Sequence, residues 1–366
     1  MADRPVEPVT SAYYHARAAR AGIPLDGTFE LTARCNFDCR MCYVHGAAQT
    51  SDGELSAGQW IALAREARDA GLLYLLLTGG EPLVRSDFCE IYEATAQMGF
   101  LISVNTNGSL LTDAHYDLFD RYPPMRVNVS LYGADDDVYE YVTGRRQLDN
   151  VCGAIRRLRA MDVPVTVNFI ANRVNTGQIE EILALADSLG AIVRPTAYIY
   201  PPLRAACHGE DCDLRPSARD AAAAHYRIQA LRSGPQRMRA IADGLIRPDE
   251  EGCVDDRAPD GRMRCRAGKS AFWVTWDGRL LPCGMLTKPA VPLAPGGFAA
   301  AWERLKAETA AIRMPQNCVA CPDYRHCQVC AAMCLCETGR FDETPPYMCA
   351  MTKEVLRLFR QGRDVS

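Results

Sequence analysis

The sequence predicts an α/β fold in which a curved parallel sheet precedes a small cysteine-rich region. Two observations predict this. Over the first 205 of 366 residues, short apolar runs typical of buried strands alternate with amphipathic stretches typical of helices. Such alternation favours right-handed crossovers and therefore a parallel sheet. After about residue 260 the cysteine density rises, and without an export signal these cysteines favour metal sites over disulfides.

Composition argues against two classes of partner. The chain is 48% hydrophobic and 23% charged, with a net charge of −4, and no basic run suggests nucleic-acid binding. No segment approaches the roughly 20 consecutive apolar residues that a membrane span needs. We therefore expect a cytoplasmic protein with neither a nucleic-acid nor a membrane partner.

Shifts in composition divide the chain into five predicted segments. After Tyr200 the sequence becomes charged and is interrupted by prolines until about residue 260. The expected segments are an N-terminal arm at 1–25, the strand–helix region at 26–205, a linker with a helix at 206–260, a cysteine-rich domain at 261–349 and a C-terminal helix or tail at 350–366.

The strand–helix region contains six units. A strand at 29–32 leads into a loop of three cysteines, and an apolar run at 72–77, bounded by glycines, is the second strand. The remaining strands are expected at 100–108, 127–133, 164–170 and 192–197. Helices are expected between them at 56–70, 86–99, 148–161 and 176–189.

The cysteine loop after the first strand has the spacing C-x3-C-x2-C. Cys35, Cys39 and Cys42 form it, and the aromatic Tyr43 follows the third cysteine directly. Three thiolates this close can hold three irons of a [4Fe–4S] cluster. The fourth iron then has no protein ligand and can bind a small molecule, as an open metal position does in a catalytic site. A zinc site or reduced core thiols is the alternative.

A glycine-rich turn ends the second predicted strand. Thr78-Gly79-Gly80-Glu81-Pro82 lies at the strand's carboxyl end, where ligands bind to parallel sheets. Two glycines let the backbone approach a ligand closely. A carboxylate or carbonyl in this turn can accept a hydrogen bond from an ammonium group.

The cysteine loop and the Gly-Gly-Glu-Pro turn together resemble the radical S-adenosylmethionine (SAM) superfamily. The resemblance implies a partial (β/α)6 TIM-like barrel, with SAM as the ligand of the open iron. It also implies that polar residues at the ends of the third to fifth strands bind the SAM ribose and carboxylate, although each of these could equally be a strand-end cap. The cofactor-binding candidates are Tyr43, Gly79, Gly80, Glu81, Ser103, Asn105, Asn107, Ser130 and Asn168.

The cysteine-rich region opens with a predicted β-hairpin around Asp277-Gly278. Gly278-x4-Cys283, the run Cys318-x2-Cys321-x5-Cys327 and the final Cys349 resemble the SPASM extension of radical SAM enzymes, which binds two auxiliary [4Fe–4S] clusters. The departure is local: Cys330 follows Cys327 after two residues, and the expected three-residue step comes only before Cys334.

The resemblance assigns the C-terminal cysteines to two ligand sets. Cys318, Cys321, Cys327 and Cys349 would hold an outer cluster. Cys265 and Cys283 would hold an inner cluster, together with two of Cys253, Cys330, Cys334 and Cys336. One or two zinc knots built from Cys318, Cys321, Cys327 and Cys330 are the alternative.

The implied reaction is a reductive cleavage of SAM to methionine and a 5′-deoxyadenosyl radical, which abstracts hydrogen from a substrate. A flavodoxin or ferredoxin is the expected electron donor, and the auxiliary clusters would accept an electron from the substrate. Cys207 and Cys212, in the linker, are candidate hydrogen-atom donors or ordinary surface thiols.

The substrate is the open part of the prediction. Oxidation or cross-linking of a ribosomally made peptide or protein is expected. The alternatives are dehydrogenation or epimerisation of an aminoglycoside-type sugar or another small metabolite, and a non-catalytic metal-binding or electron-carrier protein. Gly284 follows the second hairpin cysteine where anaerobic sulfatase-maturing enzymes carry an acidic residue, which argues against that subclass.

Overall fold

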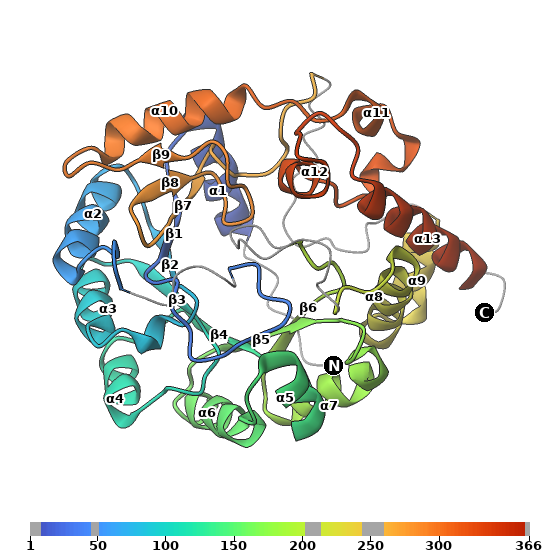
Figure 1. Cartoon of the computed structure of the whole chain (residues 1–366), viewed down its shortest axis with the longest axis horizontal. Helices are drawn as coiled ribbons and strands as arrows, with labels where there is room; N and C mark the ends of the chain where they lie inside the picture. The colour runs from blue at the N-terminus through green and yellow to red at the C-terminus, as the bar shows by residue number, and fades with distance from the viewer. Residues whose placement is uncertain (1–8, 45–50, 202–213, 244–259, 363–366) are drawn as a thin grey trace.

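The computed structural model describes residues 9–44, 51–201, 214–243 and 260–362. Six parallel strands form the barrel part of one curved sheet in the order β6-β5-β4-β3-β2-β1 (Figure 1). These strands are β1 (Asp26–Glu30), β2 (Tyr74–Thr78), β3 (Leu101–Thr106), β4 (Arg126–Ser130), β5 (Val165–Ile170) and β6 (Ile192–Thr196). The predicted partial (β/α)6 barrel is confirmed.

The second strand begins later than its sequence predicts. Leu72 is apolar and buried, but its amide donates to Ala67 O at 2.9 Å and so closes the preceding helix. Gly71 before it has φ of +114°, a conformation that glycine adopts without strain. The strand therefore starts at Tyr74 and reaches Thr78, the first residue of the glycine-rich turn.

The helices between the strands cover the outside of the curved sheet (Figure 1). Ser56 caps α2 with a capping box that includes Gln59. Beyond the expected helices, α4 and α5 follow β3 and β4, and α1 lies in the predicted arm. The helices up to β6 are α1 (Val9–Ala21), α2 (Ala57–Asp69), α3 (Phe88–Gln97), α4 (Asp113–Arg121), α5 (Asp136–Thr143), α6 (Leu148–Ala160) and α7 (Ile179–Ser188), with the 3-10 turns η1 (Pro82–Val84) and η2 (Thr176–Gln178).

The two faces of the barrel sheet differ in polarity. Phe29 stacks on Trp60 of α2 with ring centroids 4.9 Å apart, so its face is the helix-covered one. Leu77, Val104, Val129 and Val167 share this face by register or alternation and are fully buried. The opposite, concave face carries the polar residues Thr28, Glu30, Thr78, Ser103, Asn105, Asn128, Ser130, Thr166 and Asn168.

The sheet continues from the barrel into the cysteine-rich region. Strand β7 (Ala271–Val274) pairs in parallel with β1, with Asp26 opposite Ala271. The predicted hairpin is then completed by β8 (Arg279–Leu281), and β9 (Val291–Pro292) adds the last strand of a nine-stranded sheet. The predicted boundary near residue 260 therefore does not interrupt the sheet.

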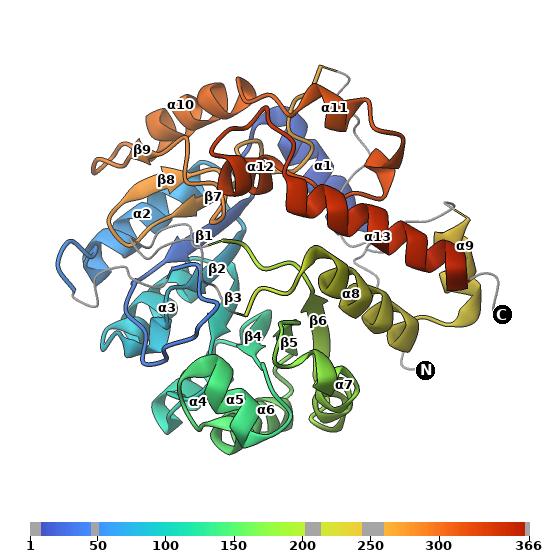
Figure 2. The same ribbon diagram turned by 45° about the vertical axis from the view of Figure 1, so that its right-hand side comes forward.

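The remaining helices follow the barrel. Helix α8 packs along α13, where Tyr226 and Phe359 meet with ring centroids 5.1 Å apart. Figure 2 shows α12 between the hairpin and the start of α13. Across the described residues, no helix is long and apolar enough to cross a membrane. These helices are α8 (Ala218–Arg232), α9 (Pro235–Ala242), α10 (Phe298–Ala310), α11 (Gln316–Val319), η3 (Pro322–Arg325), α12 (Ala331–Thr338) and α13 (Pro346–Gly362).

Candidate functional site

The cysteine loop leaves the carboxyl end of β1 and reaches across to α5. The amides of Asp38 and Arg40 donate to Thr143 O and Val142 O, both at 3.0 Å. Between the second and third cysteines, Met41 is 8% exposed and packs in a small apolar cluster with Val142, Ile199 and Leu214. The three thiols therefore lie on a loop that is fastened at both ends.

The glycine-rich turn lies against the start of this loop. Gly80 N donates to Thr32 O at 2.8 Å, and Glu81 N donates to Arg34 O at 2.9 Å. A Cβ on Gly80 would lie 2.5 Å from Arg34 O, and one on Gly79 would lie 2.7 Å from Thr32 O. The glycines are therefore required by a close approach of two backbones, which brings the turn beside Cys35.

The Glu81 side chain is fully buried and holds the end of β3. Its carboxylate accepts from Leu83 N at 3.1 Å, Thr106 Oγ1 at 2.8 Å and Asn107 N at 2.6 Å. Burial raises the pKa of Glu81 to about 7, while these hydrogen bonds oppose the increase. Glu81 thus connects the ends of two strands; contact between its carboxylate and SAM stays a prediction.

Asn107 is also tied to the cysteine loop. Its Nδ2 donates to Asn36 Oδ1 at 2.8 Å, and Asn36 Nδ2 donates to Ser109 Oγ at 2.9 Å. Asn36 directly follows Cys35 and is not among the residues that the sequence indicates. An asparagine between two cysteines carries no local signal, since its partners lie more than 70 positions further along the chain.

The other four predicted polar residues share the concave face of the sheet. Ser130 lies opposite Asn168, and Asn105 lies opposite Asn128 and accepts from its Nδ2 at 2.7 Å. Ser103 lies on the same face, two residues before Asn105 in β3. Tyr43 is half-buried in the loop, directly after Cys42. The structure therefore brings the strand candidates together beneath one edge of the sheet.

A buried ion-pair network holds the residue before Cys35. The Arg34 guanidinium donates to both carboxylate oxygens of Glu54, at 3.0 and 3.1 Å. Arg85 donates to the same carboxylate at 3.3 Å and to Leu31 O at 2.9 Å. Glu54 and Arg85 side chains are each 5% exposed. This bidentate pairing fixes the start of the cysteine loop to the turn after β2.

The thiols of the loop suit a metal rather than isolated cysteines. The pKa of Cys35 is raised to about 11, by burial first and also by the charges of Glu81 and Cys42. The pKa of Cys39 is likewise raised, by burial first and then by the charges of Cys42 and Cys35. Thiolates so placed repel one another and need bound cations to offset their charge. The loop therefore fits a group that supplies several iron ions.

Four of the C-terminal thiols lie between α11 and the start of α13. Cys318 is on α11, its Sγ lies 3.5 Å from Thr344 Oγ1, and Cys321 N donates to Cys318 O at 3.1 Å. Thr352 Oγ1, one turn after Cys349 on α13, donates to Cys327 Sγ at 3.2 Å. The pKa of Cys327 is raised by burial first, and also by Cys318 and Cys349. The thiols of the predicted outer set therefore lie in one region, and their role as ligands of one cluster stays a prediction.

The remaining thiols gather around the turn after β8 and the start of α12. Met285 N donates to Cys283 Sγ at 3.4 Å, and Cys336 Sγ donates to Met285 O at 3.8 Å. The pKa of Cys283 is raised to about 11. Burial is the largest cause, and the charges of Cys265 and Cys330 also raise it. Cys330 caps α12.

Cys334 differs from these thiols in its surroundings. It is fully buried on α12. Its pKa is raised by burial first and then by the charges of Cys318 and Cys330, so Cys334 has a neighbour in each of the two sets. By contrast, the pKa of Cys336 is raised to about 12 by burial first, and then by the charges of its neighbours Cys330, Glu337 and Cys283. Three other predicted candidates, Cys207, Cys212 and Cys253, lie outside the described residues.

Within the described ranges, no three His, Cys, Asp or Glu side chains form a group that could hold a metal ion. At the C-terminal thiols, both the [4Fe–4S] assignment and the zinc alternative therefore stay predictions.

Trp273 joins the hairpin to the barrel. Its indole Nε1 donates to Glu30 Oε2 at 2.6 Å, and Glu30 is fully buried on the concave face. A Cβ on Gly284 would lie 2.8 Å from the Trp273 ring. An acidic side chain after Cys283 would therefore collide with this ring, which explains the glycine that the sequence carries there.

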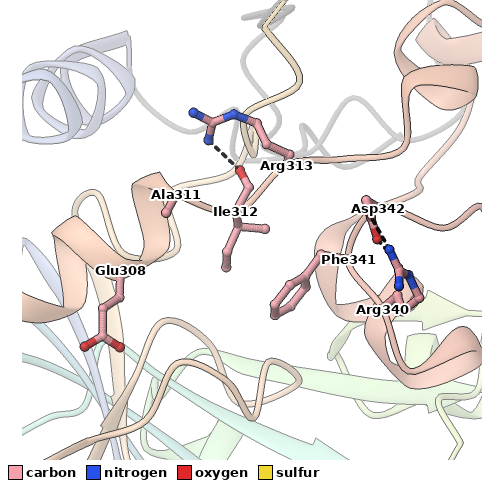
Figure 3. Close-up of a pocket in the computed structure, with 7 residues that line it drawn as sticks. All are labelled: Glu308, Ala311, Ile312, Arg313, Arg340, Phe341 and Asp342. Carbon is pink, nitrogen blue, oxygen red and sulfur yellow. Dashed lines mark hydrogen bonds and ion pairs between the residues drawn. The ribbon is translucent and has the colours of Figure 1, made fainter.

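A separate groove of about 470 Å3 lies between the end of α10 and the segment after α12. Figure 3 shows the Phe341 ring directed toward Ile312, with Arg340 paired to Asp342. None of the predicted site residues lines this groove, whose walls are Glu308, Ala311, Ile312, Arg313, Arg340, Phe341 and Asp342.

Two solved structures have the same fold as this chain. Streptococcus suis SuiB bound to precursor peptide SuiA has a TM-score of 0.66 and 16% identity, covering 95% of this chain and 82% of SuiB. Native anSMEcpe with bound AdoMet has a TM-score of 0.71 and 15% identity, covering 93% of this chain and 98% of that one. At this identity the likeness concerns the fold, a partial barrel followed by a cysteine-rich region.

Sequence relatives identify the family. A probable GTP 3′,8-cyclase of Methanothermobacter thermautotrophicus is 31% identical over 263 residues, covering 69% of this chain and 82% of the relative. The AdoMet-dependent heme synthase of Methanosarcina barkeri is 25% identical over 334 residues, covering 87% and 94%. The family model that matches residues 29–186 is described as the Radical SAM superfamily, a family that implies a [4Fe–4S] cluster and SAM. The chain belongs to the radical SAM superfamily and is an enzyme.

Proposed function

We propose that this protein is a SPASM-type radical SAM oxidoreductase that modifies a ribosomally made peptide or protein. The observation that carries the proposal is the cysteine loop at the carboxyl end of β1, hydrogen-bonded to the Gly79-Gly80 turn. Ligands of barrel enzymes bind at this end of the strands. The turn, the loop and the concave polar face thus lie around one site at the carboxyl end of the barrel strands.

The chain's own residues have separable tasks at this place. Cys35, Cys39 and Cys42 hold the first cluster. The Gly79-Gly80 turn, Asn107 after β3, Tyr43 in the loop and the concave-face side chains bind and orient SAM. The concave-face side chains are Ser103, Asn105, Ser130 and Asn168. When bound, the cluster and SAM supply a radical that abstracts hydrogen from the substrate.

The C-terminal thiols hold two auxiliary clusters. The outer cluster takes Cys318, Cys321, Cys327 and Cys349, and the inner takes Cys265, Cys283, Cys330 and Cys336. The shared contact of Cys283 and Cys336 with Met285 supports the second set, and it favours Cys336 over Cys334 among the candidates that the sequence leaves open. Replacing Cys336 by Ser should remove about four irons per chain, whereas Cys334→Ser should remove none.

The peptide substrate is supported by the fold shared with SuiB, which binds its precursor peptide. The second candidate is oxidation of a small metabolite, which the heme synthase favours because the similarity spans nearly its whole length. Either reaction would run in the cytoplasm with electrons from a flavodoxin or ferredoxin, because the described cysteines are free thiols, which a reducing compartment maintains.

Anaerobic reconstitution tests the proposed chemistry. The protein should bind about twelve irons per chain and form 5′-deoxyadenosine from SAM under a strong reductant. Zinc in place of iron, without SAM cleavage, would contradict it. The substrate class is tested by adding peptides encoded beside the gene, or porphyrin and sugar metabolites. The true substrate should raise 5′-deoxyadenosine formation and lose hydrogen in the mass spectrum.

A further inference from the structure

Tyr200 lies between the last barrel strand and the inner set of thiols. It follows β6 by a few residues, and its hydroxyl oxygen is 3.8 Å from the Sγ of Cys330. Cys330 caps α12, the helix that also carries Cys336. The phenol of Tyr200 therefore contacts a proposed cluster ligand from the carboxyl end of β6.

The position of the Tyr200 ring is determined by a rigid neighbour. Tyr198 meets it edge to face, with ring centroids 4.9 Å apart and an angle of 82° between the rings. Tyr198 is 4% exposed, and its hydroxyl donates to Glu337 Oε1 at 2.5 Å. The Tyr200 ring therefore packs against a side chain that cannot easily change rotamer.

Glu337 joins this pair of tyrosines to the helix of cysteines. Its side chain is 3% exposed and accepts from Arg215 Nη2 at 2.9 Å and from Tyr347 N at 3.1 Å. It directly follows Cys336 on α12. The buried carboxylate thus keeps α12, and with it Cys330 and Cys336, in a fixed position relative to the end of β6.

We propose that Tyr200 donates a hydrogen bond to the sulfur of iron-bound Cys330 and thereby raises the reduction potential of the inner cluster. The proposal rests on the proposed auxiliary cluster. A thiolate bound to iron carries no proton, so in this contact the phenol is the donor. Reduction adds one electron to the cluster, and a hydrogen bond to a ligand sulfur stabilises that added negative charge.

The consequence would be an inner cluster that accepts an electron more readily. Tyr200 touches neither SAM nor the reacting atoms, so it is a positioning residue that acts through Cys330.

The experiment uses the full chain with Cys35, Cys39 and Cys42 replaced by Ala, so that only the auxiliary clusters contribute to the spectrum. Tyr200→Phe, which removes the hydroxyl and keeps the ring, is introduced into this background. We expect about eight irons per chain with and without Tyr200→Phe, and a lower midpoint potential for one of the two clusters in a redox titration followed by electron paramagnetic resonance.

Tyr347→Phe is the matched control. Its hydroxyl donates to Pro216 O at 2.9 Å rather than to a thiol, so its removal should leave both potentials unchanged. Eight irons with unchanged potentials in Tyr200→Phe would overturn the inference while the proposed function stands. A background protein without iron would overturn the proposed auxiliary clusters themselves, and the inference with them.

Discussion

The two cysteine regions of this enzyme are built by different means. The barrel loop carries its three thiols within residues 35–42, and backbone hydrogen bonds to Val142, Thr143 and the Gly80 turn hold it. The C-terminal thiols extend from Cys265 to Cys349 and are held by helices and side-chain contacts. A local site can thus be recognised from spacing, whereas a dispersed site depends on tertiary contacts.

The largest effect should follow from a change in the backbone contact of the first region. In Gly80→Ala, the new Cβ would overlap Arg34 O and Ala33 O at 2.5 and 2.6 Å. Neither backbone can move without displacing the cysteine loop, so we expect a loss of about 3 kcal/mol in the free energy of unfolding. Chemical denaturation of the apoprotein measures the stability, and iron content after reconstitution should fall.

Gly153→Ala is its control. Gly153 lies in the interior of α6, and nothing lies within 4 Å of an added Cβ. This change should stabilise the protein by about 0.5 to 1 kcal/mol, since alanine is the better helix former. Equal behaviour of the two variants would contradict the close approach of the turn and the loop.

A side-chain contact of the second region should have the next largest effect. Glu337→Ala leaves the Tyr198 hydroxyl and Arg215 without their buried acceptor, which should cost about 2 kcal/mol. Iron bound by the C-terminal thiols should decrease with it. Asp342→Asn, at an exposed pair with Arg340, should change neither quantity measurably. A Glu337→Ala protein as stable as its parent would show that the buried hydrogen bonds of Glu337 do not stabilise this region.

The smallest effect concerns pH and a helix away from both regions. His115 accepts from Thr112 N at 3.1 Å in the capping box of α4, and burial lowers its pKa from 6.5. A lowered histidine pKa gives stability above pH 6.5 that is lost as the pH falls through the folded-state pKa.

His115→Gln keeps an acceptor for the capping box and does not titrate. Below pH 6.5 the parent should therefore lose stability relative to the variant, by less than about 1 kcal/mol because the imidazole is partly exposed. Thermal melts at a series of pH values measure this difference. Parallel melting curves at every pH would contradict the lowered pKa.

The barrel was largely predictable because its elements have local signals. The helix expected in the linker at 206–260 is α8, and all six strands lie close to their expected positions. The pairing of β7 with β1 was not predicted, since strand order between distant segments has no local signature.

The site was predictable only in part. The spacing of Cys35, Cys39 and Cys42 marked the loop, but Asn36, Glu30 and Tyr200 were missed because each interacts with a residue far along the chain. The distinction between Cys334 and Cys336 likewise depends on which helix face meets the turn after β8. Spacing alone leaves both residues as candidates.

One comparison of variants tests the separation of the two regions most directly. Replacing Cys35, Cys39 and Cys42 together by Ala should abolish 5′-deoxyadenosine formation and leave the C-terminal iron in place. Replacing Cys318 and Cys321 by Ala should leave SAM cleavage measurable but abolish the modified product. If the triple variant still cleaves SAM, the assignment of the barrel loop is wrong.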